Sequence, residues 1–314
     1  HQGAEIIINV TCATKVMAIA AYEAARQKNC SAIYVDTAHG RFLNLTSPGE
    51  QAIPIRIGLR DYLSFYGRQP QKSFEFKNLS VSKDKAIEVA NYLANAGVNA
   101  LNTLIWMRKY SPGKGRRTIR AKCKRPLESN QWEVLCQLNK LGLISNLQKI
   151  SETEISYLIA RDHDWKFLDG TWLEVYVWHQ AEKCIDEEGG PLFDECDFSI
   201  EILGKGGAKK EIDVGCIYRG QLIHCSCKSG QNPFKTRYLD ELRAISSLIG
   251  GRFCTRLFIT NVPRPSENSP GWKDFQSFLQ QAKDREIVVV TGEELLNIGA
   301  ILKREAKKPT FWRV

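Results

Sequence analysis

The residues best suited to chemistry lie on two short segments that a turn joins. Glu211 and Asp213 alternate on the first segment. Ser226 and Lys228 alternate on the second, after a turn at Arg219-Gly220. Residues two apart on a strand project from one face, so each pair is expected on one side of a sheet. A carboxylate facing a lysine across a hairpin suits metal-assisted cleavage of a phosphodiester, in which the acid holds a divalent cation and the lysine offsets developing charge. The alternative is an ordinary hairpin with a cross-strand Asp–Lys pair.

A further acid lies upstream, in a largely apolar run. Glu174 is the one early acid of this run, which follows Gly170 and continues to Lys183. The unbroken apolar stretch predicts a helix packed into a core. A buried glutamate needs a partner or a metal, and a helix, a strand and a turn can bring Glu174 to Asp213.

The order of these elements resembles a known nuclease fold. A helix with Glu174, a strand with Asp213, a strand with Lys228 and a predicted helix over Lys235–Leu248 follow one another as in the PD-(D/E)xK fold. The segments GTWLE, EIDV and CKSG are similar to the nuclease half of the CRISPR-associated ancillary nucleases that carry an N-terminal CARF domain. The resemblance implies that Asp213, Glu174 and the Cys227 carbonyl hold Mg²⁺ or Mn²⁺ while Lys228 orients water or phosphate. The implied activity is metal-dependent cleavage of DNA or RNA.

One position departs from that family. The strand before the lysine usually reads Glu-Cys-Lys, whereas here it reads Ser226-Cys227-Lys228. A serine hydroxyl is at best a weak neutral ligand for a hard cation that prefers carboxylates. Three alternatives follow: a weaker metal site, compensation by Glu211, or an inactivating substitution. The last defines a rival function, a non-catalytic or weakly active regulator that binds nucleic acid.

The N-terminal segment carries a second candidate site. The predicted strand Ala4–Val10 leads through a polar turn into a predicted buried, alanine-rich helix over Val16–Arg26. Free N–H groups and the helix dipole at such a helix start favour an anion. The side chains that could hold the anion are Asn9, Thr11, Thr14 and Lys15. The alternative is that the threonines only cap the helix.

This turn resembles the CARF motif Asn-x-Thr-Gly-Gly-Thr-Lys, with Cys12-Ala13 in place of the two glycines. The resemblance implies an activator, cyclic oligoadenylate and above all cyclic tetra-adenylate, that binds across the axis of a homodimer in antiviral CRISPR defence. A CARF domain normally has earlier strands and helices, so the sensor is expected to be incomplete in this chain.

The expected architecture is mixed α/β in three parts. They are a Rossmann-like CARF sensor over 1–75, a basic linker with a helical, winged-helix-like middle segment over 76–165, and a PD-(D/E)xK nuclease domain over 166–314. In the sensor we expect strands over Ala32–Val35, Arg41–Leu45 and Ile53–Ile57 and a helix over Leu59–Tyr66. In the middle we expect helices over Trp132–Leu141 and Ser151–Ala160. Towards the C-terminus we expect strands over Phe253–Asn261 and Glu286–Thr291 and helices over Trp272–Lys283 and Glu293–Arg304.

The charge and composition fit a protein that handles nucleic acid. The chain of 314 residues has a net charge of +9, and nine of the eighteen residues from Arg108 to Arg125 are basic. Within this stretch the predicted phosphate contacts are Arg116, Arg117, Arg120 and Lys122, and the alternative is a solvated connector. No apolar run reaches the length of about 18 residues that a membrane span needs, and no signal peptide is visible, so we expect a cytoplasmic protein. The ten cysteines form no C-x-x-C pair, which argues against zinc and for reduced thiols.

Overall fold

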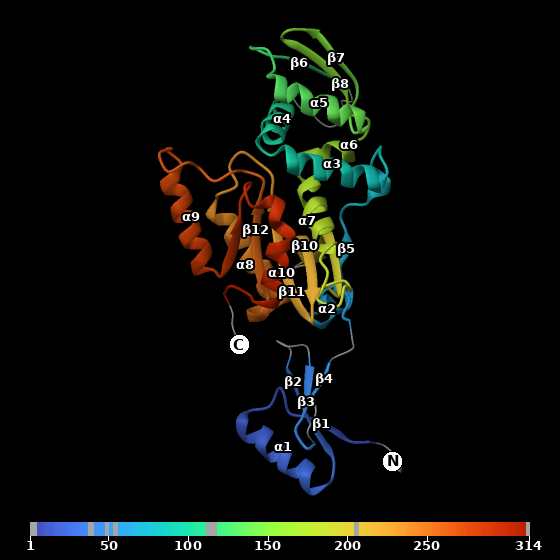
Figure 1. The fold of residues 1–314 in the computed structure, drawn as a ribbon, viewed down its shortest axis with the longest axis vertical. Helices are drawn as coiled ribbons and strands as arrows, with labels where there is room; N and C mark the ends of the chain where they lie inside the picture. Colours follow the sequence, from blue (N-terminus) through green and yellow to red (C-terminus); the bar gives the residue numbers. More distant parts are fainter. Residues whose placement is uncertain are drawn as a thin grey trace.

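The structure, a computed structural model, describes residues 5–36, 41–47, 50–52, 56–110, 118–203 and 207–311. Three sheets follow one another along the long axis of the molecule, with a four-stranded sheet at one end, a six-stranded sheet in the centre and a three-stranded sheet at the other end (Figure 1). The predicted mixed α/β class is confirmed.

The four-stranded sheet has the order β1-β2-β3-β4 and carries one helix. Its elements are β1 (Ile7–Asn9), α1 (Lys15–Gln27), β2 (Ser31–Asp36), β3 (Arg41–Asn44) and β4 (Glu50–Ala52). β1 and β2 are parallel and α1 connects them, whereas β3 and β4 are antiparallel to their neighbours. The strand predicted over Ile53–Ile57 lies mostly outside the described residues.

The prediction that α1 is a buried helix is wrong. Val16, Met17 and Ile19 are 77%, 61% and 65% exposed, and Ala25 alone within α1 is buried. The helix packs on β1 and β2, and the described part of the chain leaves Val16, Met17 and Ile19 exposed. An apolar pattern predicts a helix, but burial also requires a neighbour on that face.

The six-stranded sheet has the order β13-β12-β11-β10-β9-β5. Its strands are β5 (Gln71–Lys72), β9 (Glu195–Leu203), β10 (Lys209–Tyr218), β11 (Gln221–Lys228), β12 (Thr255–Thr260) and β13 (Ile287–Val290). The pairs among β11, β12 and β13 are parallel, and the pairs from β11 to β5 are antiparallel. Arg219 and Gly220 have φ of 50° and 74°, so both central residues of the two-residue hairpin turn are left-handed, as a type I′ turn requires.

Helices cover both faces of this sheet. α7 (Trp172–Glu182) and α10 (Ile298–Lys307) pack with Leu257 and Ile259 on one face. α8 (Thr236–Ile249) and α9 (Trp272–Asp284) pack with Phe258 on the other. Successive residues of β12 thus enter opposite cores, as expected for a strand buried on both faces. The helices and strands predicted for this half are confirmed, with a 3₁₀ turn (Leu295–Asn297) preceding α10.

The helix predicted over Leu59–Tyr66 packs on the six-stranded sheet, although its sequence suggested a place in the sensor half. In α2 (Leu59–Phe65), Leu59, Tyr62 and Leu63 share a core with residues of β9, β10, β11 and α8. β5 then pairs with the outer edge of β9. The central sheet therefore takes elements from both sides of the middle segment, which is an insertion into it.

The middle segment contains helices and a small antiparallel sheet of order β6-β8-β7. Its elements are α3 (Lys83–Ala96), α4 (Val98–Lys109), β6 (Thr118–Lys122), α5 (Ser129–Lys140), β7 (Ser145–Ser151), β8 (Glu154–Leu158) and α6 (Asp162–Lys166). A 3₁₀ turn over Phe76–Asn78 precedes them. Helices beside a β7–β8 hairpin agree with the winged-helix-like description.

The helix predicted over Ser151–Ala160 is wrong, because β8 (Glu154–Leu158) occupies its centre. Ile155, Tyr157 and Ile159 are buried at every second position, which is the strand period and not the helix period. The basic stretch is not a simple loop either, since α4 runs to Lys109 and β6 begins at Thr118.

The place of α2 can be tested by mutation. Leu63 is fully buried and Phe65, two residues on, is 76% exposed. We expect Leu63→Ala to lower the free energy of unfolding of the central sheet by about 2–5 kcal/mol, because it leaves a cavity. Urea unfolding followed by tryptophan fluorescence measures this, since Trp172 and Trp178 lie in α7 on the sheet. Phe65→Ala is the control and should change the unfolding free energy little. Equal effects of the two changes would contradict this packing.

Candidate active site

One carboxylate oxygen joins the two strands that the sequence singled out. Asp213 Oδ2, on β10, accepts hydrogen bonds from Ser226 Oγ at 3.2 Å, from the Cys227 amide at 2.7 Å and from Lys228 Nζ at 3.1 Å. All three donors belong to β11. The structure thus brings the predicted Asp213, Ser226 and Lys228 together, while their catalytic roles stay predictions.

The hairpin fixes this arrangement. The type I′ turn sets a register in which Val214 pairs with Cys225, so Asp213 lies beside Ser226. A slip of one residue would turn every side chain of β11 to the other face. The buried apolar residues of β11 on one face and the polar contacts to Asp213 therefore favour the same register.

Lys228 keeps its proton. Burial opposes the charge of Lys228, but the attraction and hydrogen bond of Asp213 outweigh it and raise the pKa of the ammonium group above its usual value. The group also lies 5.8 Å from the centre of the Tyr238 ring. A lysine that stays charged through neutral pH donates hydrogen bonds and stabilises negative charge, and it cannot serve as a general base.

Glu174 reaches the same site from α7. Its Oε2 atom is buried without a hydrogen-bond partner in the described structure. Burial raises the pKa of Glu174 well above its usual value, and the nearby charges of Asp213 and Glu211 add to this more than Lys228 and Lys166 offset it. Glu174 and Asp213 therefore share one electrostatic environment, as the sequence predicted.

Two carboxylates without enough compensating charge suit a hard divalent cation. Mg²⁺ takes oxygen ligands and is commonly held by one or two carboxylates, with water and substrate phosphate completing the shell. The partnerless Glu174 Oε2 and the mutual repulsion of the two acids fit such an ion. No group of three or more His, Cys, Asp or Glu that could hold a metal occurs in the described ranges.

Cys225 and Cys227 behave as packing residues. Burial raises the pKa of both thiols well above the usual value, and Asp213 raises them further. Neither is activated as a nucleophile. All ten cysteines lie in the described residues as free thiols. The carbonyl of Cys227 stays a predicted metal ligand.

The role of Arg108 was not predicted from the sequence. Its Nε donates to Asp169 Oδ1 at 2.6 Å, and its Nη2 donates to the carbonyls of Asp169 and Ser229. Asp169 lies in a π-helical turn (Phe167–Thr171) that leads into α7 and Glu174, and Ser229 directly follows Lys228. Arg108 therefore ties the end of α4 to the supports of both Glu174 and Lys228, although its neighbours suggested a basic surface.

A sequence signal for this contact was present at Gly170. A Cβ atom there would lie 3.3 Å from Ser229 Oγ, so the turn and the segment after Lys228 approach closely. π-Helical turns inside helices occur frequently at functional sites. The sequence contains this glycine, but it does not reveal that Gly170 and Ser229 lie close together in the fold.

The predicted sensor residues shape their own turn. Asn9 Oδ1 accepts from the Thr11 amide at 3.0 Å and from Thr11 Oγ1 at 2.6 Å. Thr11 Oγ1 in turn accepts from the Val35 amide at 2.7 Å, which joins the turn to β2. Thr14 caps α1 by accepting from the Met17 amide at 3.3 Å. Lys15 is exposed at the first residue of the helix. Their contacts with a ligand stay predictions.

The predicted nucleic-acid contacts are described only in part. Arg120 and Lys122 are exposed on β6, and Arg120 Nε lies 3.6 Å from Glu154. Arg116 and Arg117 lie outside the described residues.

Comparisons with known proteins agree with this organisation. Residues 1–62 match the family model of the Card1 CARF domain. Protein VC1899 from Vibrio cholerae has a similar structure, with a TM-score of 0.72 and 16% identity over 98% of this chain and 77% of that one. Can2 from Sulfobacillus thermosulfidooxidans, solved in complex with cyclic tetra-adenylate, has a TM-score of 0.68 and 20% identity over 96% of this chain and 75% of that one. No curated protein matches the sequence.

The family match places a CARF segment at residues 1–62, and the larger part of the chain builds a six-stranded mixed sheet with helices on both faces. The predicted resemblance to the CARF-containing CRISPR ancillary nucleases is thereby confirmed. Among CARF families, the N-terminal segment is similar to that of Card1. Within the described residues, no helix combines the length and hydrophobicity needed to cross a membrane.

The raised pKa of Glu174 predicts a pH-dependent stability in metal-free protein. An acid whose pKa is raised by folding contributes its full stability below the unfolded pKa of about 4.3, and that stability is lost as the pH rises through the folded pKa. Glu174→Gln should therefore unfold at higher urea than the parent at pH 8, and the difference should shrink as the pH falls towards 4. Urea titrations with a chelator at several pH values measure it. The same change at the exposed Glu267 is the control. A difference in urea midpoint that does not change with pH would show that folding does not raise the pKa of Glu174.

Proposed function

We propose that the protein is a metal-dependent nuclease that cleaves DNA or RNA and is activated by cyclic oligoadenylate. The observation that carries this proposal is the convergence on Asp213 of the three donors of β11, together with a nearby Glu174 whose Oε2 atom is buried without a hydrogen-bond partner in the described residues. If the Asp213–Lys228 pair were only structural, the nearby Glu174 would have no purpose. A buried acid without a hydrogen-bond partner lowers the stability of the fold.

Asp213, Glu174 and the Cys227 carbonyl would hold Mg²⁺ or Mn²⁺. When bound, the ion supplies Lewis-acid chemistry, which makes water a better nucleophile and neutralises charge on a phosphate. Lys228, fixed against Asp213, donates hydrogen bonds to the attacking water or to the phosphate. Ser226 holds Asp213 in place through its hydroxyl and adds at most a weak neutral ligand.

The sensor role rests on the N-terminal segment. Its match to the Card1 CARF domain and the fold shared with Can2, which was solved with cyclic tetra-adenylate, support this ring as the activator. The exposed Lys15, at the start of α1, can attract a phosphate of the ring with the help of the helix dipole.

A homodimer is part of the proposal. Ile6, Ile7, Val16, Met17 and Ile19 are all more than half exposed on the N-terminal segment. A group of apolar side chains on one segment favours burial against another chain. A second copy would cover these residues and bring two activator turns together.

A nucleic-acid surface on the middle segment completes the proposal. The exposed Arg120 and Lys122 alternate on β6, so both project from one face of the small sheet. Basic residues on one face suit contact with a phosphate backbone. Arg108 does not belong to this surface because its guanidinium group binds Asp169 and Ser229.

One observation favours the rival function, a regulator that binds nucleic acid without cleaving it. Asp213 Oδ2 already accepts hydrogen bonds from protein donors, and the chain reads Ser226-Cys227-Lys228 where the nucleases that it resembles usually read Glu-Cys-Lys. Tight binding of a labelled oligonucleotide without cleavage, with Mn²⁺ and cyclic tetra-adenylate both present, would support this rival.

Cleavage of a labelled oligonucleotide tests the catalytic proposal. In the presence of Mn²⁺ and cyclic tetra-adenylate we expect Asp213→Asn to lower the rate by about 10²-fold or more, because a preorganised electrostatic group is lost. The control is Asp274→Asn, at an exposed aspartate of α9, which should cleave like the parent. Calorimetric titration should show weaker Mn²⁺ binding for Asp213→Asn alone. Unchanged Mn²⁺ binding would reject Asp213 as a ligand.

The sensor proposal has a matched pair of lysines. Lys15 and Lys28 are both exposed and lie at the start and just after the end of α1. We expect Lys15→Ala to weaken the binding of cyclic tetra-adenylate by about 1–3 kcal/mol, the range for a charged hydrogen bond. Lys28→Ala should bind as the parent does. Calorimetry gives both affinities, and equal affinities would mean that the turn only caps the helix.

A further inference from the structure

We propose that Ser73 is a positioning residue for Asp213. Ser73 belongs to the connector, residues 56–74, which carries α2 and β5 and leads from the N-terminal segment into the central sheet. It acts through Ser199 on β9 and Glu211 on β10. This inference rests on the proposed nuclease function, because it assigns a support to the proposed metal ligand.

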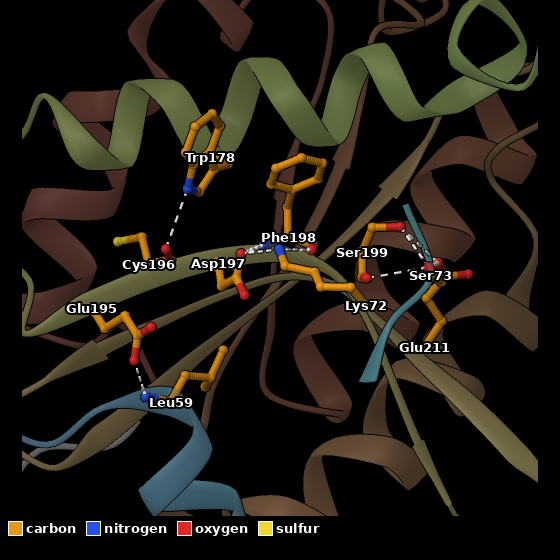
Figure 2. Close-up of polar contacts among 10 residues, drawn as sticks. All are labelled: Leu59, Lys72, Ser73, Trp178, Glu195, Cys196, Asp197, Phe198, Ser199 and Glu211. Atoms are coloured by element: carbon orange, nitrogen blue, oxygen red, sulfur yellow. Dashed lines mark hydrogen bonds and ion pairs between the residues drawn. The ribbon is translucent and has the colours of Figure 1, made fainter. Parts of the chain in front are cut away.

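The connector is attached to β9 at several successive positions. Figure 2 shows the Leu59 amide donating to the Glu195 carboxylate and Lys72 paired with Asp197. Lys72 Nζ also donates to the Phe198 carbonyl at 2.8 Å. A displacement of the connector is therefore transmitted to β9 and is not absorbed by a loose loop.

Ser73 makes the last of these contacts. Its amide donates to the Ser199 carbonyl at 3.0 Å, and the two hydroxyl oxygens lie 2.6 Å apart. Glu211 Oε1 accepts from Ser73 Oγ at 2.6 Å and from Ser199 Oγ at 3.1 Å, so one carboxylate oxygen gathers both hydroxyls (Figure 2). The cluster thus joins the residue that directly follows β5 to β9 and β10 at one point.

The backbone at Ser199 has an unusual conformation. Ser199 is fully buried within β9, and its φ is 51°. For a residue with a Cβ atom, the left-handed region is uncommon, and such residues persist where surrounding contacts hold them. Ser73 and Glu211 supply those contacts.

Ser199 lies directly across from Asp213. Ile200 pairs with Ile212 and Phe198 pairs with Val214, so the register leaves Ser199 and Asp213 opposite each other. The local shape of β9 therefore sets the path of β10 at the proposed metal ligand. Loss of the Ser73 contacts would let Ser199 relax and shift Asp213 relative to the donors on β11.

Phe74, which follows Ser73, contacts the support of Glu174. Phe74 is buried, and its ring lies 6.3 Å from Phe167 and 6.0 Å from Phe198, measured between ring centres. Phe167 begins the π-helical turn that leads into α7 and Glu174. Two adjacent residues of the connector thus contact the supports of both proposed metal ligands.

The test compares Ser73→Ala with Gln71→Ala, at an exposed neighbour on β5. In metal-free protein, we expect Ser73→Ala to speed amide hydrogen exchange at Ile212–Val214, whereas Gln71→Ala leaves it unchanged. Mn²⁺ affinity and the single-turnover cleavage rate should each fall roughly fivefold to tenfold, the effect of about one lost hydrogen bond. The KM for the oligonucleotide should stay the same. Ser73→Thr retains the hydroxyl and should resemble the parent.

A second variant separates positioning from general damage. Glycine adopts positive φ without strain, so Ser199→Gly should make Ser73 less necessary. We expect Ser73→Ala to have a smaller effect on exchange and Mn²⁺ binding in the Ser199→Gly background than alone. Equal exchange and Mn²⁺ affinity for Ser73→Ala and Gln71→Ala, or an undiminished effect in that background, would overturn the inference. A parent protein that neither binds Mn²⁺ nor cleaves would instead reject the nuclease function, while the exchange measurement would still decide the role of Ser73.

Discussion

The hydrogen bonds to Asp213 Oδ2 are the constraint on which the candidate site depends. One oxygen on β10 binds a hydroxyl, an amide and an ammonium group of β11, so a change of register would break all three bonds. None of these donors reaches Glu174 Oε2, which is buried without a hydrogen-bond partner in the described residues. The site is therefore rigid where β10 meets β11 and electrostatically unbalanced where α7 meets them. A rigid and electrostatically unbalanced arrangement is typical of a preorganised ion site. In a purely structural ion pair, the same arrangement would lower the stability of the fold.

The parts of the fold that the sequence predicted are those with local signals. Arg219-Gly220 indicates a tight hairpin, alternation makes an acid of the first strand face Lys228 across that hairpin, and the apolar run after Gly170 indicates α7. The parts that it did not predict depend on distant partners. β5 is only two residues long and forms a strand because β9 pairs with it. Arg108 is one of many basic residues in its part of the sequence, and its role becomes clear only when the fold brings Asp169 and Ser229 to it.

In the N-terminal segment too, the sequence predicted local structure but not contacts with distant residues. The polar turn and the helix after it follow from Asn9, Thr11 and Thr14, whose side chains make only local contacts and one bond to β2. The burial expected for α1 did not follow, since no local rule states what lies against Val16 or Ile19. A sequence can therefore predict the shape of the turn without predicting the surface that surrounds it.

The insertion of the middle segment affects how the chain can fold during synthesis. Lys72 and Phe198, which meet at the edge of the central sheet, are 126 residues apart. α2 and β5 leave the ribosome long before β9, β10 and β11, and they have no sheet to join until those strands follow. The middle segment, whose small sheet is formed by nearby residues, can fold in the interval and bring the two ends of the insertion together. We therefore expect a slow, late closure of the central sheet, as for other non-local β pairings. During that interval the exposed Leu59, Tyr62 and Leu63 would be natural binding sites for chaperones.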